Sequence, residues 1–160
     1  FPNLTDRDWL WGGSPETIAQ TIAVGVNSSK SKDTRVSQML AFGSDGILDN
    51  NAVLAVTDYV LSLSDPAHAA GRTSQSVAAG QAVFAANCVA CHGPEGRGNQ
   101  ALGVPDLTDR TWLYGGDAQS VYTSVYDGRQ GEMPAWQNQL SPVDRKILVV
   151  YLLDKGASRR

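Results

Sequence analysis

This chain of 160 residues lacks three features that would indicate other classes of protein. It has only two cysteines, Cys88 and Cys91, so no second cysteine pair is present to complete a zinc site. Its 13 Lys and Arg residues are scattered and the formal net charge is −3, so we expect no nucleic-acid partner. No apolar run approaches the roughly 20 residues that cross a bilayer, and the first residues do not resemble a signal peptide. We therefore expect a soluble chain without a membrane anchor of its own.

The sequence does contain an internal repeat. PNLTDRDWLWGG at residues 2–13 returns as PDLTDRTWLYGG at residues 105–116, which is 103 residues later. MLAF at residues 39–42 matches MPAW at residues 133–136, which is 94 residues later, so the first copy carries a longer loop before its methionine. The small and polar residues 65–74 between the copies are typical of a linker. We predict a first domain over 1–64, a linker over 65–74 and a second domain over 75–160.

Helical spacing of apolar residues predicts an all-α fold. Four helices are expected to begin after polar caps, and the caps are Ser14, Asp49 or Asn50, Asp117, and Ser141 followed by Pro142. We expect Gly156 to end the last of these helices. A further helix is expected over about residues 75–87, and Gly80 within it suggests that another helix backbone approaches closely. The face of the last helix that carries Tyr151 is the candidate partner.

Residues 88–92 read Cys-Val-Ala-Cys-His, and this spacing is typical of covalent haem attachment. Two thiols one helical turn apart can reach the two vinyl groups on one porphyrin edge, and His92 then places an imidazole nitrogen on the iron. A thioredoxin-type redox pair is the alternative, but no strand and turn precede the motif. The sequence therefore predicts one haem c, bound through Cys88, Cys91 and His92.

Met133 is the candidate for the second axial ligand of this haem. It lies in a loop with glycine and proline, Gly-Glu-Met-Pro-Ala-Trp, which could hold a thioether over iron without the constraints of a helix. A soft sulfur ligand favours ferrous iron and raises the reduction potential. The alternative is that Met133 only fills space in a core.

Residues 75–160 resemble a class I cytochrome c domain, with a helix bearing glycine and an aromatic residue, CxxCH, a Pro-x-Leu segment at Pro105 and Leu107, a Met-Pro loop and a last helix with an aromatic residue. In that family the proline carbonyl accepts a hydrogen bond from the ligand histidine, so the resemblance assigns this role to Pro105 with His92. Separately, Trp112 is a candidate to line the haem and Arg129 to bind its propionates. The alternatives are a core aromatic and a solvated surface arginine.

Over its whole length the chain resembles the dihaem cytochrome c subunit, CcoP or FixP, of cbb3-type cytochrome c oxidases. The resemblance rests on the repeated Leu-Thr-Asp-Arg-x-Trp-Leu blocks and the tandem Met-x-Ala-aromatic loops. It implies an electron carrier that is no enzyme on its own and that passes electrons from a cytochrome c or bc1-type donor to the oxidase core. The other oxidase subunits would be its partners, on the periplasmic side of the bacterial inner membrane.

The first copy departs from this family pattern, because a CxxCH matching that of the second copy would fall before Phe1. We therefore expect a tandem repeat whose first copy lacks the haem-attachment helix, whereas two haems are expected in the intact family member. Met39 is either the axial ligand of that first haem or a simple apolar contact.

A haem enzyme, either a peroxidase or the cytochrome domain of a dehydrogenase, is the alternative function, because the tandem arrangement alone permits it. Turnover of hydrogen peroxide would favour the enzyme, whereas an absorption band from methionine-to-iron ligation would favour the electron carrier.

Overall fold

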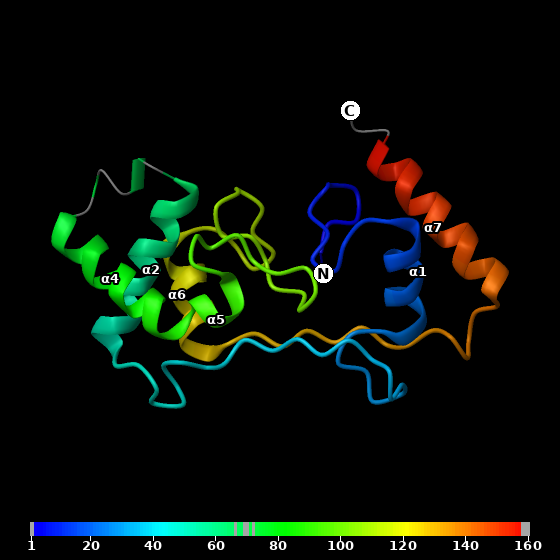
Figure 1. The fold of residues 1–160 in the computed structure, drawn as a ribbon, viewed down its shortest axis with the longest axis horizontal. Helices are drawn as coiled ribbons and strands as arrows, with labels where there is room; N and C mark the ends of the chain where they lie inside the picture. Colours follow the sequence, from blue (N-terminus) through cyan, green and yellow to red (C-terminus); the bar gives the residue numbers. More distant parts are fainter. Residues whose placement is uncertain (1, 66, 69–70, 72, 158–160) are drawn as a thin grey trace. The chain divides into compact units, whose positions relative to one another are not determined.

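The computed structural model describes residues 2–65, 67–68, 71 and 73–157. Over these residues helices are joined by loops, and β-pairing is limited to isolated bridges. The helices are α1 (Pro15–Val24), α2 (Asn50–Ser64), α4 (Ser74–Asn87), α5 (Val89–His92), α6 (Ala118–Asp127) and α7 (Pro142–Ala157) (Figure 1). The expected all-α class is confirmed. Of the expected linker 65–74, residues 66, 69, 70 and 72 lie outside the described residues.

The helices begin where polar side chains satisfy their first backbone N–H groups. Ser14, Asp49 and Asp117 accept hydrogen bonds from the backbone N–H groups three residues ahead, at 3.2, 2.8 and 3.0 Å. Ser141 accepts in the same way from the N–H of Asp144 at 3.1 Å. These four predicted caps are confirmed, with Asp49 rather than Asn50 capping α2.

The expected end at Gly156 is wrong, because α7 continues to Ala157. Nowhere in the described ranges is a helix both long and apolar enough to span a membrane.

The chain forms two compact units that do not follow the expected domain boundaries. Unit 1 comprises Phe1–Ser37, Gln100–Gly103 and Gln130–Arg160, and unit 2 comprises Gln38–Asn99 and Val104–Arg129. The expected boundaries at residues 64 and 75 therefore fall inside unit 2. The physical reason is that α2, which ends the first copy, packs against α4, which begins the second.

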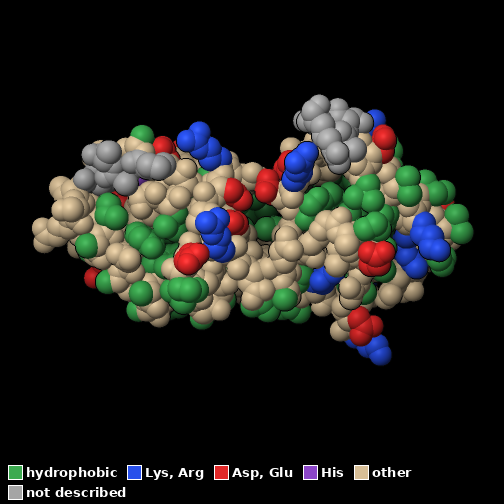
Figure 2. All heavy atoms as spheres, turned by 45° about the horizontal axis from the view of Figure 1, so that its top comes forward, with side chains coloured by type: hydrophobic (Ala, Val, Ile, Leu, Met, Phe, Trp, Pro, Cys, Tyr) green, Lys and Arg blue, Asp and Glu red, His purple; other side chains and the backbone are tan. Residues whose placement is uncertain are grey.

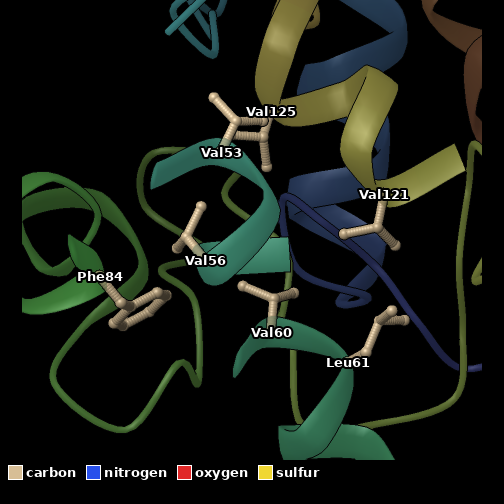
Figure 3. Close-up of a cluster of buried hydrophobic side chains, with 7 residues drawn as sticks. All are labelled: Val53, Val56, Val60, Leu61, Phe84, Val121 and Val125. Carbon is tan, nitrogen blue, oxygen red and sulfur yellow. The ribbon is translucent and has the colours of Figure 1, made fainter. Parts of the chain in front are cut away.

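The core of unit 2 is built by α2, α4 and α6. Its buried side chains come from all three helices (Figure 3), and they are Val53, Val56, Val60, Leu61, Phe84, Val121 and Val125. Gly80 allows α4 to approach α2 closely, since a Cβ there would collide with the backbone carbonyl of Ala55 and lie 2.8 Å from the Cβ of Tyr59. The expectation that Gly80 packs on the Tyr151 face of α7 is thus wrong. Tyr59, the tenth residue of α2, takes the place expected for Tyr151, the tenth residue of α7.

Unit 1 has a smaller core between α1 and α7. Ile18 and Ile22 of α1 and Val149 of α7 form its buried cluster. Much of the rest of α7 is exposed, including Tyr151 with 55% of its surface accessible. The hydrophobic side chains of α7 are accordingly visible at the surface in Figure 2.

Candidate haem site

The two cysteines lie at the junction of α4 and α5 in unit 2. Cys88 directly follows α4, and Cys91 and His92 lie on the single turn of α5. The N–H groups of Cys91 and His92 donate to the Cys88 carbonyl at 3.1 and 2.9 Å. Cys88 is half-buried and Cys91 is exposed, and both are free thiols. Burial, and secondarily the neighbouring Cys91, raises the pKa of Cys88 to about 11. The helical turn thus presents two thiols one turn apart, as predicted from their spacing.

His92 is buried and held in one orientation. Its Nδ1–H donates to the backbone carbonyl of Pro105 at 3.2 Å, so the predicted contact between these two residues is confirmed. Burial lowers the pKa of His92, while the bond to Pro105 acts in the opposite direction. With Nδ1 engaged by the carbonyl, Nε2 is the nitrogen that could bind a metal.

The loop after α5 brings Leu107 and Trp112 to the same core. The Leu107 N–H donates to the carbonyl of Gly96 at 2.7 Å, which fixes the segment that carries Pro105. Both Leu107 and Trp112 are partly buried against the core of unit 2, as Cys88 is. The structure therefore gathers Cys88, His92, Pro105, Leu107 and Trp112 of the predicted set in one unit.

Arg129 also belongs to unit 2, where it follows α6. Its Nε donates to Ser124 Oγ at 3.0 Å, and its guanidinium carbon lies 4.4 Å from the centre of the Tyr114 ring. This cation–π contact keeps the side chain in place beside the exposed Tyr114 ring.

The two methionines fall in different units. Met39 is half-buried against the core of unit 2, the cluster against which Cys88 and Leu107 also pack. Met133 is half-buried against the Ile18, Ile22 and Val149 cluster of unit 1. The structure therefore places Met133 in a different unit from His92. The sequence, in contrast, predicts that both residues bind the same haem iron.

Tyr59 was not among the predicted site residues, yet it contacts α4, the helix that directly precedes the attachment motif. Its ring centre lies 5.3 Å from that of Phe84, and the Phe84 ring centre lies 6.5 Å from that of His92. The sequence could have identified Tyr59 through its position, because it is the tenth residue of α2 as Tyr151 is the tenth residue of α7.

Comparison with known proteins places this motif in a family. Residues 75–152 match the family described as "Cytochrome C oxidase, cbb3-type, subunit III". These residues are similar to that family. The match to subunit III covers the attachment helix, the CxxCH motif and most of α7.

Proteins named as subunits of cbb3-type cytochrome c oxidases are similar to nearly the whole chain. A protein named cbb3-type cytochrome c oxidase subunit FixP, from Bradyrhizobium sp. (strain ORS 278), is 47% identical over 99% of this chain and 53% of its own length. A CcoP subunit from Cereibacter sphaeroides is 41% identical over 98% of this chain and 52% of its own length. A CcoP subunit from Azospirillum sp. (strain B510) is 42% identical over 99% of this chain and 55% of its own length. The chain spans about half the length of the curated relatives it matches.

The cytochrome c family implies haem c, and the residues of unit 2 fit that group. Two thiols stand one helical turn apart, followed directly by a histidine whose other ring nitrogen is held by a backbone carbonyl. Such an oriented, buried imidazole is a common first axial ligand of haem iron.

Proposed function

We propose that the chain is an electron-transfer cytochrome c that binds haem through Cys88, Cys91 and His92 and acts as part of a cbb3-type oxidase. The observation that carries the proposal is the buried His92, whose Nδ1–H is held by Pro105 within a CxxCH turn. The similarity to FixP and CcoP subunits over nearly the whole chain supports the oxidase assignment. A haem bound here supplies a one-electron couple between ferric and ferrous iron.

The residues around the motif would hold this group rather than react with substrate. Pro105 fixes the imidazole plane of His92, and Leu107 and Trp112 supply apolar surface against the core of the same unit. A second axial ligand would leave no open position on the iron, so little geometry would change with redox state. Arg129, held over Tyr114, is the proposed partner for a propionate.

The same proposal covers the setting of the protein. We infer a tandem pair of class I cytochrome c repeats on the periplasmic side of the inner membrane, with one haem on this chain. The other oxidase subunits and a cytochrome c or bc1-type donor are the proposed partners. The repeat that begins at Pro2 and returns at Pro105 supports the tandem arrangement.

Exchange of both cysteines tests the attachment. The chain is produced in a bacterium that matures c-type cytochromes, and Cys88→Ser with Cys91→Ser is compared with His68→Ala, which changes the other histidine of unit 2. We expect the unsubstituted chain and His68→Ala to keep their haem through acid-acetone extraction, and the double variant to lose all covalent haem. A colourless unsubstituted chain would contradict the proposal.

The haem-loaded chain also separates the carrier from an enzyme. We expect its ferrous form to bind carbon monoxide very slowly at neutral pH, because a second protein ligand besides His92 would leave no open position on the iron. Rapid carbon monoxide binding together with turnover of hydrogen peroxide would favour a peroxidase instead.

A further inference from the structure

Each methionine segment is hydrogen-bonded to the other sequence copy, at the residues that directly follow α1 or α6. The backbone of Met39 pairs with that of Arg129 through two hydrogen bonds, of 2.8 and 3.1 Å. Met133 pairs in the same way with Val26, through two bonds of 2.9 Å. Val26 and Arg129 occupy equivalent positions, because they are separated by the 103 residues of the repeat. The two contacts are thus equivalent, with the copies exchanged.

Glycine residues shape both contacts. Gly25 and Gly128, again 103 residues apart, have φ angles of 71° and 68°. A Cβ at Gly25 would collide with the Met133 carbonyl, and one at Gly128 would collide with the Met39 carbonyl. The left-handed backbone and the close approach both require glycine. Each copy therefore has an equivalent backbone position that can pair with a methionine segment. In each unit this position pairs with the methionine segment of the other copy.

The exchange continues beyond the methionines. The Phe42 N–H donates to the Val125 carbonyl at 3.1 Å, and the Trp136 N–H donates to the Ile22 carbonyl at 3.1 Å. Phe42 and Trp136 each lie three residues after a methionine, and Ile22 and Val125 are again 103 residues apart. The helices follow the same rule, since α2 packs against α4 and α6 whereas α7 packs against α1.

This exchange determines which methionine shares a unit with the attachment motif. Both cysteines and both histidines of the chain belong to unit 2, and so does Met39. Met39 packs against the buried cluster that includes Phe84, whose ring lies beside that of His92. Unit 1, which holds Met133, contains neither cysteine nor histidine.

We propose that Met39, rather than Met133, supplies the axial sulfur opposite His92 to the haem attached at Cys88 and Cys91. The inference rests on the proposed function, because it requires a haem at this site. It revises the assignment predicted from the order of residues along the chain, in which Met133, the methionine that follows the motif, ligates the haem attached there. A thioether ligand from the first copy would then tie the two copies together through the iron.

Two matched substitutions, Met39→Leu and Met133→Leu, test the assignment in the haem-loaded chain. Leucine keeps nearly the volume of methionine but cannot ligate iron. We expect Met39→Leu to abolish the red absorption band of methionine-ligated ferric haem and to let ferrous haem bind carbon monoxide rapidly. We expect Met133→Leu to keep the band and the slow binding of the unsubstituted chain. Loss of the band in Met133→Leu, or its survival in Met39→Leu, would overturn the inference.

A second pair covers the case in which Met39→Leu fails to fold. Met39→His offers the iron an imidazole, so we expect a low-spin haem without the methionine band, whereas Met133→His keeps that band. The reverse pattern would overturn the inference. Absence of covalent haem from the unsubstituted chain would instead overturn the proposed function, and this inference with it. If the haem stays attached and substitution of Met39 leaves the methionine band unchanged, this inference is overturned and the proposed function is not.

Discussion

Units 1 and 2 place equivalent helices in unequal surroundings. In unit 2, Val56 is the seventh residue of α2 and is 0% exposed, whereas in unit 1 Leu148 is the seventh residue of α7 and is 38% exposed. At the tenth position Tyr59 packs beside Gly80 and Phe84, whereas Tyr151 is 55% exposed. The two helices share an apolar pattern, so the difference lies in what covers them.

The difference comes from α4, the helix that directly precedes the attachment motif. Unit 2 has α4 packed on α2 in addition to α6, while α7 packs against α1 alone among the larger contacts of the described helices. Unit 1 therefore shows how such a unit looks without that helix, with Val143, Ile147 and Val150 of α7 at 64%, 60% and 66% exposed. The comparison indicates that α4 completes the core of unit 2 as well as leading into the cysteine motif.

The largest effect on this comparison should come from Gly80→Ala. A Cβ at position 80 meets the Ala55 carbonyl, so α4 must move away from α2 and the unit loses its tightest helix contact. We expect the free energy of unfolding of unit 2 to fall by about 3 kcal/mol, well beyond the gain in helix propensity. Urea unfolding measures the loss, and hydrogen exchange locates it in the amides of α2 and α4.

Gly156→Ala in α7 is the matched control, because the nearest atom to a Cβ there is the Asp6 carbonyl oxygen at 3.8 Å, an ordinary contact. This change should stabilise unit 1 slightly, by about 0.5–1 kcal/mol, through helix propensity. Equal effects of the two substitutions would contradict the view that α4 completes the core of unit 2.

A smaller effect is expected from truncating the seventh residue of each helix. Val56→Ala removes two buried methyl groups and leaves a cavity, so we expect a loss of about 2 kcal/mol. Leu148→Ala removes more atoms, yet its side chain is partly in water, and we expect a loss of about 1 kcal/mol or less. Thermal and urea unfolding of both variants give the order. A larger loss for Leu148→Ala would show that α7 is better covered than its exposure indicates.

Local features of this fold were predictable from the sequence because they depend on neighbouring residues. The caps at Ser14, Asp49 and Asp117 bond N–H groups only three residues away, so a short window contains both partners. The turn carrying Cys91 and His92 is local in the same sense. The bond to Pro105 was available only through the family resemblance, because its partner lies 13 residues away across a loop.

The pairing of the copies was not predictable by the same reasoning. Apolar spacing and Gly80 indicate that α4 offers a surface for another helix, but a repeat supplies two helices with the same pattern. The prediction chose Tyr151, which belongs to the same sequence copy as Gly80, and the structure has Tyr59 of the other copy instead. Periodicity identifies the face of a helix that is buried, and it does not identify which of two similar partners buries it.

The smallest predicted effect concerns the caps of the equivalent helices α1 and α6. Ser14 and Asp117 occupy the same repeat position, 103 residues apart, and only Asp117 ionises. Hydrogen bonds from the Ser120 side chain and backbone lower the pKa of Asp117 from its ordinary 3.8. A lowered pKa in the folded state means that ionised Asp117 favours folding above pH 3.8, and that this contribution disappears as the pH falls through the lower folded value.

Asp117→Ser gives α6 the cap of α1 and should remove this dependence. We expect the unsubstituted chain and the variant to differ more in free energy of unfolding at about pH 6 than at about pH 2, because the contribution of ionised Asp117 is lost as the pH falls. Urea unfolding at several pH values measures the difference, with Ser14→Ala as the control because its hydroxyl does not titrate in this range. A constant difference across the range would mean that Asp117 acts only as a neutral hydrogen-bond acceptor. The two units would then be alike at this position despite their different caps.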